Sequence, residues 1–267
     1  MRTGLCYKNA MSHAQSTERT VTACLIIIGN EILSGRTQDA NLAYLAKWLN
    51  DEVGIQMVEA RVIPDIEQTI VDAVNECRAK FDYVFTTGGI GPTHDDITGF
   101  CVAKAFGVPH ELNPKAHEIL KEYYGPEGLS SARARMAYTP KGATLIENPV
   151  SKAPGYQMEN VFVMAGIPQI MQVMCDGLKH SLNGGKPVRS RAVVTELPES
   201  RIAKILTELD QRFDNVDIGS YPFYTQGKAG TSLVVRTTDE DLLLEVSDEI
   251  FQAAFELGGN PVFDENG

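Results

Sequence analysis

The sequence predicts an α/β protein with a mostly parallel sheet, followed by a small α+β domain. Three continuous apolar runs, at Leu25–Ile28, Tyr83–Phe85 and Val161–Met164, are typical of strands that are buried on both faces. A glycine and then a helical pattern follow each run, which is the order of parallel strands joined by right-handed crossovers. Ligands of such sheets bind in loops beyond the carboxyl ends of the strands, so we look for a site there.

Periodicity and turn residues predict the other elements of the first part. Apolar residues recur at helical spacing over Leu42–Leu49, and a second strand is predicted over Ile55–Ile63. Asp65 is predicted to cap the helix that comes next. Further helical patterns cover Phe100–Phe106, Pro114–Tyr124 and Ile167–Leu178.

A domain boundary is predicted at Asn183–Pro187, where glycines and a proline interrupt the pattern. We expect a main domain over residues 21–183 and a small α+β domain over residues 187–260, with the order β-α-β-β-α. Residues 1–20 are polar and lack periodicity, so we expect a flexible tail rather than a secretory signal.

Composition and charge disfavour several classes of protein. A net charge of -11, from 35 acidic and 24 basic residues, opposes non-specific binding to nucleic acid and to anionic lipid. No apolar stretch approaches the roughly 20 residues that a membrane span needs. The five cysteines show no C-x-x-C spacing, and four stand in apolar surroundings, which favours buried thiols in a reducing compartment. We therefore expect a soluble, cytoplasmic protein.

The strongest candidate site is the glycine-rich loop within Thr86–Thr98, between a buried strand and a helix. Gly88, Gly89 and Gly91 let the backbone approach a ligand closely and turn its N–H groups toward a phosphate. The start of the next helix adds further free N–H groups. The loop is therefore predicted to bind phosphate.

Asp95 and Asp96 set this loop apart from other phosphate-binding loops. Two carboxylates beside a phosphate would repel it, and a divalent metal such as Mg²⁺ removes the conflict by sharing the oxygens of both. The alternative is that Asp96 simply caps the helix that begins near Ile97. We predict a metal site formed by Asp95 and Asp96, with Thr93 among the ligand-binding residues of the loop.

Three other residues are weaker candidates. Glu31 follows the first strand and could bind a metal or a ligand hydroxyl, and Asn41 could reach the same crevice from the start of a helix. Lys152 could pair with a phosphate. From spacing alone, a solvated loop position explains Glu31 better and a helix-start position explains Asn41 better, whereas a solvated position explains Lys152 at least as well as phosphate binding. His94 beside the aspartates could bind metal, or it could have a structural role.

These segments together resemble the N-terminal region of the competence/damage-inducible protein A (CinA) family. Its core is a three-layer molybdopterin-binding fold, shared with molybdenum-cofactor biosynthesis proteins. The matching segments are Gly29–Gly35, Asn41, Thr87–Thr98, Asn148–Pro149, Ala153–Gly155 and Gly166–Pro168. Ser151 and Lys152 depart from the Gly-Thr that the family commonly has there. Longer members also carry a C-terminal amidase domain, which we do not expect in a chain that ends at Gly267.

The resemblance implies metal-dependent hydrolysis of a nucleotide pyrophosphate such as ADP-ribose or FAD. Asp95 and Asp96 would then hold the metal or position the attacking water, the three glycines would bind phosphate, and Glu31 and Asn41 would line the pocket. The alternative is a module that binds a pterin or nucleotide without turnover. A third hypothesis, an interaction role for the small domain, includes a KH-like nucleic-acid module and carries little weight. We expect a small-molecule ligand, a homo-oligomer, no membrane partner, and no nucleic acid.

Overall fold

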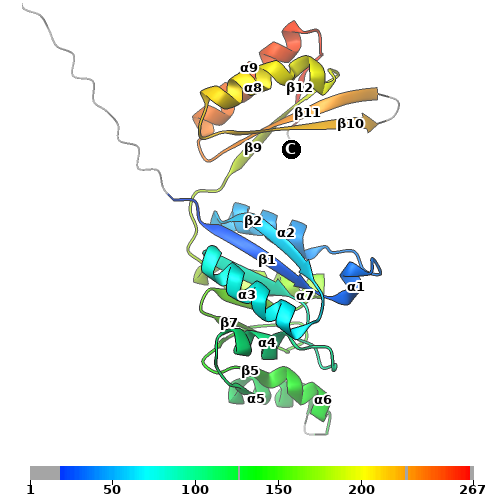
Figure 1. Ribbon diagram of the computed structural model, residues 1–267, viewed down its shortest axis with the longest axis vertical. Coiled ribbons are helices and arrows are strands. Elements are labelled where there is room, and N and C mark those ends of the chain that lie inside the picture. The colour runs from blue at the N-terminus through cyan, green and yellow to red at the C-terminus, as the bar shows by residue number, and fades with distance from the viewer. Residues whose placement is uncertain (1–18, 126, 226–227, 265–267) are drawn as a thin grey trace, which may run out of the picture.

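The computed structural model describes residues 19–125, 127–225 and 228–264 (Figure 1). The predicted N-terminal tail lies outside this part of the chain as far as residue 18. Two larger sheets, each with its own helices, and a third sheet of two strands organise the described residues. None of the helices in the described ranges is long and apolar enough to cross a membrane.

The first sheet has six strands in the order β2-β1-β3-β8-β7-β6. The first four are parallel, and β7 pairs antiparallel with both β8 and β6, which confirms the mostly parallel sheet. In chain order the strands are Thr22–Ile28 (β1), Gln56–Ile63 (β2), Tyr83–Thr87 (β3), Thr144–Ile146 (β6), Gly155–Met158 (β7) and Val161–Met164 (β8).

Alternate residues of β1 enter two different hydrophobic cores. Leu25 and Ile27 pack in the core of α2 (Asn41–Trp48) and α7 (Pro168–Leu178). Cys24 and Ile26 pack in the core of α3 (Glu67–Lys80) and α4 (Thr98–Ala105) on the other face. The period of two along a strand produces this division. The sheet therefore lies between two helical layers, as the three-layer fold requires.

A small subdomain follows α4 and contacts this helix through both of its strands. Its two antiparallel strands, β4 and β5, pair His110–Leu112 with Tyr138–Pro140. The segment between them contains α5 (Pro114–Tyr124), α6 (Ser131–Ala134) and the short 3-10 helix η2 (Arg135–Ala137). The prediction of α5 is confirmed residue for residue, with Asn113 capping it through bonds from Lys115 N and Ala116 N.

Three short helical segments complete the first part of the fold. They are α1 (Asn30–Leu33), η1 (Leu49–Val53) and η3 (Lys179–Ser181). The predicted cap of α3 is wrong, because Ile66 occupies that position and no side chain caps the helix. Asp65 instead accepts a hydrogen bond from Asn30 N at 2.9 Å. Its carboxylate thus fixes the loop before α3 to the start of α1.

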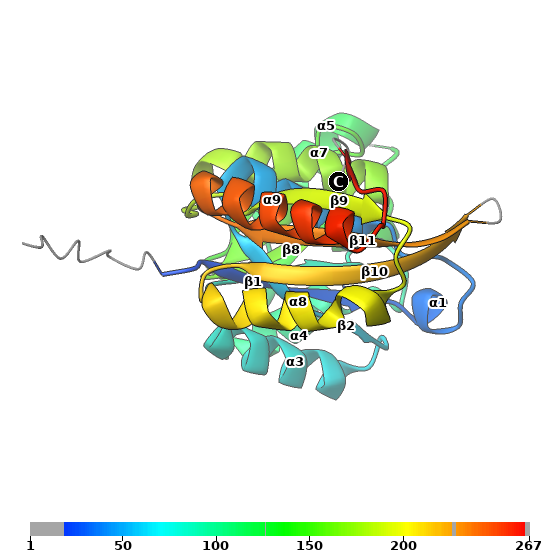
Figure 2. The ribbon, with the colours of Figure 1, turned by 90° about the horizontal axis from the view of Figure 1, so that it is seen from above.

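The second sheet is antiparallel, with the order β10-β11-β9-β12. Its elements are β9 (Arg189–Thr195), α8 (Glu199–Arg212), β10 (Asp217–Thr225), β11 (Lys228–Thr237), α9 (Glu240–Glu256) and β12 (Val262–Asp264). The helices α8 and α9 lie on one face of the sheet and share a hydrophobic core with it (Figure 2). The expected β-α-β-β-α order is present, and β12 adds a strand that the sequence did not predict.

Candidate functional site

The loop after β3 takes a path that requires glycine at two successive positions. Gly88 and Gly89 have φ values of +100° and +66°. A Cβ on Gly88 would lie 2.1 Å from the Ile28 carbonyl oxygen, and one on Gly89 would lie 2.1 Å from Thr98 Oγ1. The loop is thus pressed between the end of β1 and the start of α4, where a side chain has no room.

The same loop presents backbone donors without acceptors. Thr98 holds the two ends of the loop together with two hydrogen bonds. Its hydroxyl donates to the Gly88 carbonyl and its backbone N–H donates to the Gly89 carbonyl, both at 3.0 Å. Among the described residues, the backbone N–H groups of Gly89, Ile90 and Gly91 donate no hydrogen bond. Free N–H groups in a glycine loop suit an anionic ligand.

Asp95 and Asp96 converge on one hydroxyl group. Thr93 Oγ1 lies 2.5 Å from Asp95 Oδ1 and 2.5 Å from Asp96 Oδ2, so the two carboxylate oxygens are within twice that distance of each other. A hydroxyl has one proton, and it can donate to one of them at a time. Hydrogen bonding with Thr93 holds the pKa of Asp95 below its usual value. The lowered pKa favours the charged form of Asp95.

The alternative role for Asp96, as a helix cap, is not what the structure shows. The residue at the N-cap of α4 is Ile97, and no side chain caps that helix. Asp96 Oδ2 accepts instead from the backbone N–H of Thr93 at 2.8 Å. The carboxylate of Asp96 thus stabilises the loop itself.

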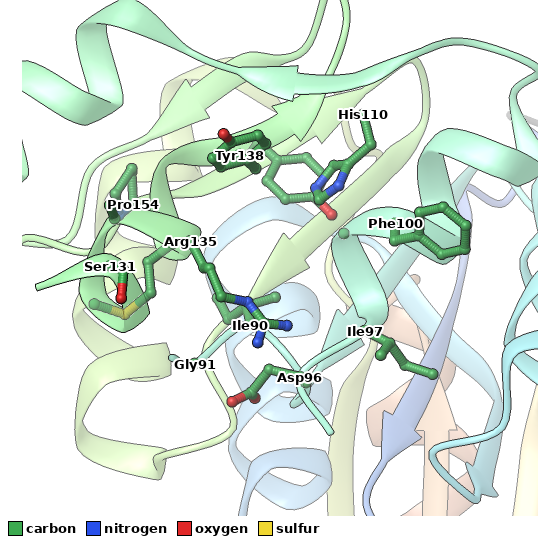
Figure 3. Close-up of a pocket in the computed structure, with 15 residues that line it drawn as sticks. Ile90, Gly91, Asp96, Ile97, Phe100, His110, Ser131, Arg135, Tyr138 and Pro154 are labelled. Atoms are coloured by element: carbon green, nitrogen blue, oxygen red, sulfur yellow. The ribbon is translucent and has the colours of Figure 1, made fainter. Parts of the chain in front are cut away.

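A cavity of about 560 Å³ opens beside this loop, between Gly89–Gly91 and the α6–η2 segment (Figure 3). Asp96 lies on its wall, and Arg135 extends into it toward Asp96 (Figure 3). Within the described ranges, no carboxylate is close enough to form an ion pair with Arg135. The cavity therefore combines free N–H donors, a carboxylate and an unpaired guanidinium.

Sequence reasoning missed Arg135 and placed the cation at Lys152 instead. Arg135 belongs to no glycine-rich motif and lies far along the chain from the loop, so only the fold brings it there. Lys152 is exposed, has a φ of +61° and does not line the cavity. Its loop is organised by the buried Asn148, whose amide donates to Ser151 Oγ and to the Ala153 carbonyl.

Glu31 lies just beyond the carboxyl end of β1, and Asn41 lies at the start of α2, next to the segment beyond β8. Asn41 is 4% exposed, and its Nδ2 donates to the Gly166 carbonyl at 2.8 Å. Its Oδ1 is buried without a hydrogen-bond partner. The Glu31 carboxylate folds over Gly29, where a Cβ would lie 2.5 Å from Glu31 Oε1. Neither residue lines the cavity beside Asp96.

The aspartate pair fits a hard cation with an incomplete set of protein ligands. Asp95 Oδ1, Asp96 Oδ2 and Thr93 Oγ1 are oxygen donors of the kind that Mg²⁺ prefers. In the described part of the chain, no further acidic, histidine or cysteine ligand meets the pair. Water and phosphate oxygens would complete the coordination, as is usual for Mg²⁺. The side chain of His94 is 95% exposed, and its Nδ1 lies 3.9 Å from Asp95 Oδ1.

A second cluster of ligand-type side chains lies elsewhere, between β1, β2 and α3. Cys24, Glu59 and Cys77 meet there, with the two sulfur atoms 3.5 Å apart. Both cysteines are fully buried, as the sequence predicted, and Cys101 and Cys175 are buried free thiols too. The Glu59 oxygens are already paired with Arg61 and Lys80 at 2.6 Å. The two cysteines are therefore part of the hydrophobic core, and Glu59 belongs to the ion pairs at its edge.

Comparisons with known proteins agree with the fold of the first domain. Residues 24–183, more than half of the chain, match the family described as a probable molybdopterin binding domain. The chain belongs to this family. The molybdopterin-binding domain is followed by residues 187–256, which match the family described as FAD synthase, middle domain.

Two archaeal relatives match a stretch that is longer than the molybdopterin-binding domain alone. A protein of Pyrobaculum calidifontis is 37% identical over 212 residues, which is 75% of this chain and 80% of the relative. A protein of Pyrococcus furiosus is 36% identical over 215 residues, which is 74% of this chain and 84% of the relative.

The resemblance to the CinA family is confirmed over the molybdopterin-binding domain. The crystal structure of a CinA protein from Thermoplasma acidophilum, described as of unknown function, is 32% identical to this chain. The TM-score is 0.57, and the match covers 61% of this chain and 98% of that one.

Proposed function

We propose that this protein is a metal-dependent hydrolase that splits the pyrophosphate of a nucleotide such as ADP-ribose or FAD. The observation that carries the proposal is the convergence of Asp95 and Asp96 on the Thr93 hydroxyl, beside the free N–H groups of the glycine loop. The match to the middle domain of FAD synthase supports a nucleotide as the ligand.

Charge is the main requirement of this reaction, because a pyrophosphate brings negative oxygens next to two carboxylates. A divalent cation held by Asp95 and Asp96 supplies part of the neutralisation. The N–H groups of Gly89–Gly91 and the Arg135 guanidinium would bind the remaining phosphate oxygens. The cavity between them is within the size range of sites for small ligands.

In the chemical step, a water oxygen forms a bond to one phosphorus and the bridging P–O bond breaks. Asp96, on the wall of the cavity, would orient this water and accept a proton from it. The leaving phosphate keeps the bonding electrons and is stabilised by Arg135. Asp95, which does not line the cavity, would act by holding the cation.

One observation favours the alternative of binding without turnover. Asp96 Oδ2 already accepts hydrogen bonds from Thr93, which reduces its freedom to take a proton from water. The loop would then hold a phosphate and the cation without activating a nucleophile. The two functions differ in their products and can be separated by one assay.

The test incubates the full chain with Mg²⁺ or Co²⁺ and with ADP-ribose, FAD or NADH, and separates the products by chromatography. We expect release of AMP from at least one nucleotide and loss of this activity with a chelator. Asp96→Asn keeps the shape of the side chain and should lower the rate by about 100-fold or more. Asp210→Asn, an exposed position on α8, should match the wild type.

Two results would count against the hydrolase. The first is tight nucleotide binding without any product at either metal, which supports the binding module. The second is hydrolysis that Asp96→Asn leaves unchanged while circular dichroism shows a folded variant, which removes the aspartate pair from the mechanism.

A further inference from the structure

The cavity has an aromatic end, formed by the small subdomain. His110 and Tyr138 lie on the side opposite Asp96 and Gly91, and Phe100 flanks His110 (Figure 3). The ring centroid of His110 is 6.3 Å from that of Phe100 and 5.8 Å from that of Tyr138. Phe100 and Tyr138 are 46% and 42% exposed, so part of each ring is free to contact a ligand. Such rings are suited to pack against a planar ligand.

Two polar atoms at this end have no hydrogen-bond partner. They are His110 Nε2 and the hydroxyl oxygen of Tyr156, and both are shielded from solvent. Tyr156 is 3% exposed and lines the cavity from β7. A buried polar group without a partner is costly, so its persistence beside a cavity indicates a group that binds there.

Gly99 keeps a space open between these two atoms. A Cβ on Gly99 would lie 3.0 Å from His110 Nε2 and 3.5 Å from the Tyr156 hydroxyl oxygen. Both atoms therefore lie close to the same side of Gly99, and a ligand group placed between them could contact both. Because the second residue of α4 is a glycine, no side chain crowds the two atoms.

The hydrogen-bonding capacity of His110 decides what that group is. Burial lowers the pKa of His110, so the ring is neutral at pH 7, and the backbone of Tyr138 accepts a hydrogen bond from it. Because Nε2 has no partner, the proton of the neutral ring lies on Nδ1, and Nε2 is an acceptor. The phenol oxygen of Tyr156 can accept as well. Two acceptors around one position fit a group with two N–H donors.

We propose that the aromatic end of the cavity binds the amino-bearing edge of a heteroaromatic ring, such as the adenine of a nucleotide. The exocyclic amine would stand beside Gly99 and donate to His110 Nε2 and Tyr156, with the ring packed against Phe100 and Tyr138. This inference rests on the proposed function for the choice of a nucleotide, but it requires no turnover.

The test compares AMP with IMP by isothermal titration calorimetry on the full chain, because IMP has a carbonyl oxygen in place of the amine. We expect wild type to bind AMP about tenfold more tightly, since the IMP oxygen would face the lone pair of Nε2. His110→Phe should bring this ratio close to one, and Tyr156→Phe should lower it. His180→Phe and Tyr123→Phe, at exposed positions outside the cavity, should leave it unchanged.

GMP is included because its ring also carries an amine, and tighter binding of GMP than of AMP would assign the edge to a guanine-type ring. Equal affinities of wild type for AMP and IMP, a ratio that persists in His110→Phe, or no binding of any of the three nucleotides would overturn the proposal. The assay needs no metal and no pyrophosphate, so a failure to detect hydrolysis leaves its outcome intact. Hydrolysis without discrimination against IMP overturns this inference and leaves the hydrolase.

A second variant tests the space itself without removing a polar group. Gly99→Ala places a methyl group 3.0 Å from His110 Nε2 and 3.5 Å from the Tyr156 hydroxyl oxygen, where it would crowd the amine, in a helix that favours alanine over glycine. AMP affinity should fall at least tenfold while the melting temperature is maintained. Gly177→Ala, in α7 with nothing within 4 Å of its Cβ position, is the matched control. Unchanged AMP affinity in a folded Gly99→Ala protein contradicts the proposed position of the ring.

Discussion

The side-chain amide of Asn41 donates to the carbonyl of Gly166 at 2.8 Å and so joins the start of α2 to the residue beyond β8. A Cβ on Gly166 would lie 3.2 Å from Gly88 Cα, so this contact also borders the glycine loop after β3. Asn41 thus helps to hold together the ends of strands that are far apart in the sequence. Its candidate role as a ligand residue and its structural role are separable by experiment.

Replacement of Asn41 should lower the stability of the protein. Asn41→Ala removes a buried hydrogen bond and leaves the Gly166 carbonyl without this donor, which costs about 1–3 kcal/mol in the free energy of unfolding. Urea unfolding followed by circular dichroism measures the difference, with the exposed Asn215→Ala as the control. A stability equal to wild type, together with weaker nucleotide binding, would show that Asn41 serves the ligand alone.

Alanine at Gly88 should be far more harmful than alanine at another glycine with positive φ. At Gly88 the new methyl group meets the Ile28 carbonyl oxygen at 2.1 Å, so the loop or β1 must move. Gly142 has a φ of +87° and open space around its Cβ position, so Gly142→Ala adds backbone strain of about 1–2 kcal/mol. We expect Gly88→Ala to cost several kcal/mol, roughly 3 or more, by thermal unfolding. Similar melting temperatures for the two variants would contradict a tightly confined loop at Gly88.

Arg135 should contribute to ligand binding, whereas its neighbour Arg133 should not. Arg133 donates to the Gly128 carbonyl and stacks on Tyr124, so it is engaged away from the cavity. Arg135→Gln should weaken ADP-ribose binding by about tenfold or more, because a charged hydrogen bond to phosphate is lost. Arg133→Gln should change the affinity less than about twofold, since it loses no contact with the ligand. Calorimetric titrations of both variants decide the matter, and equal effects would exclude a specific role for Arg135.

Acid should remove a contribution that Asp82 makes to stability. Its carboxylate accepts from Thr22 N at 2.9 Å and from Thr22 Oγ1 at 3.0 Å, and the backbone bond is the main reason that the pKa of Asp82 is lowered. A carboxyl group with a lowered pKa stabilises the fold above its unfolded pKa of about 3.9 and loses that effect as the pH falls through the folded value.

Asp82→Asn should therefore lower the free energy of unfolding by about 1 kcal/mol at pH 7, and the difference should shrink below about pH 4. Urea unfolding between these pH values measures it, with the exposed Asp214→Asn as the control. A difference between wild type and Asp82→Asn that stays constant with pH would show that protonation of Asp82 is not the cause.

The long buried strands were predictable from sequence, and the short strands were not. The runs at Leu25–Ile28 and Val161–Met164 are apolar on both faces, which is a signal that few other structures produce. In contrast, β4, β5, β6 and β12 have three residues each, too few to show a period of two. The cap at Asp65 failed because a partner distant in sequence, Asn30 N, takes its carboxylate.

The candidate site also has a part that the sequence predicts and a part that it does not. Gly88 and Gly89 could be assigned to a special backbone conformation because consecutive glycines directly after a buried strand are typical of a turn with positive φ. Arg135 and His110 could not be assigned to the site, because they lie on a separate subdomain and carry no motif. Lys152 had a motif but lies outside the cavity. The local sequence therefore predicts the backbone conformation of this site well. It does not predict which side chains the tertiary structure brings to the site.

The short strand β12 pairs with β9 on the side opposite β11, through Val262 opposite Val194 and Asp264 opposite Ala192. Without it, β9 would become the outermost strand of the sheet, with a row of unpaired N–H and C=O groups. Such an edge is a template for association between molecules, so shortening this chain before Val262 would produce aggregation rather than a simple loss of stability. Recombinant versions of the protein should keep these last residues, and affinity tags are better placed at the N-terminus.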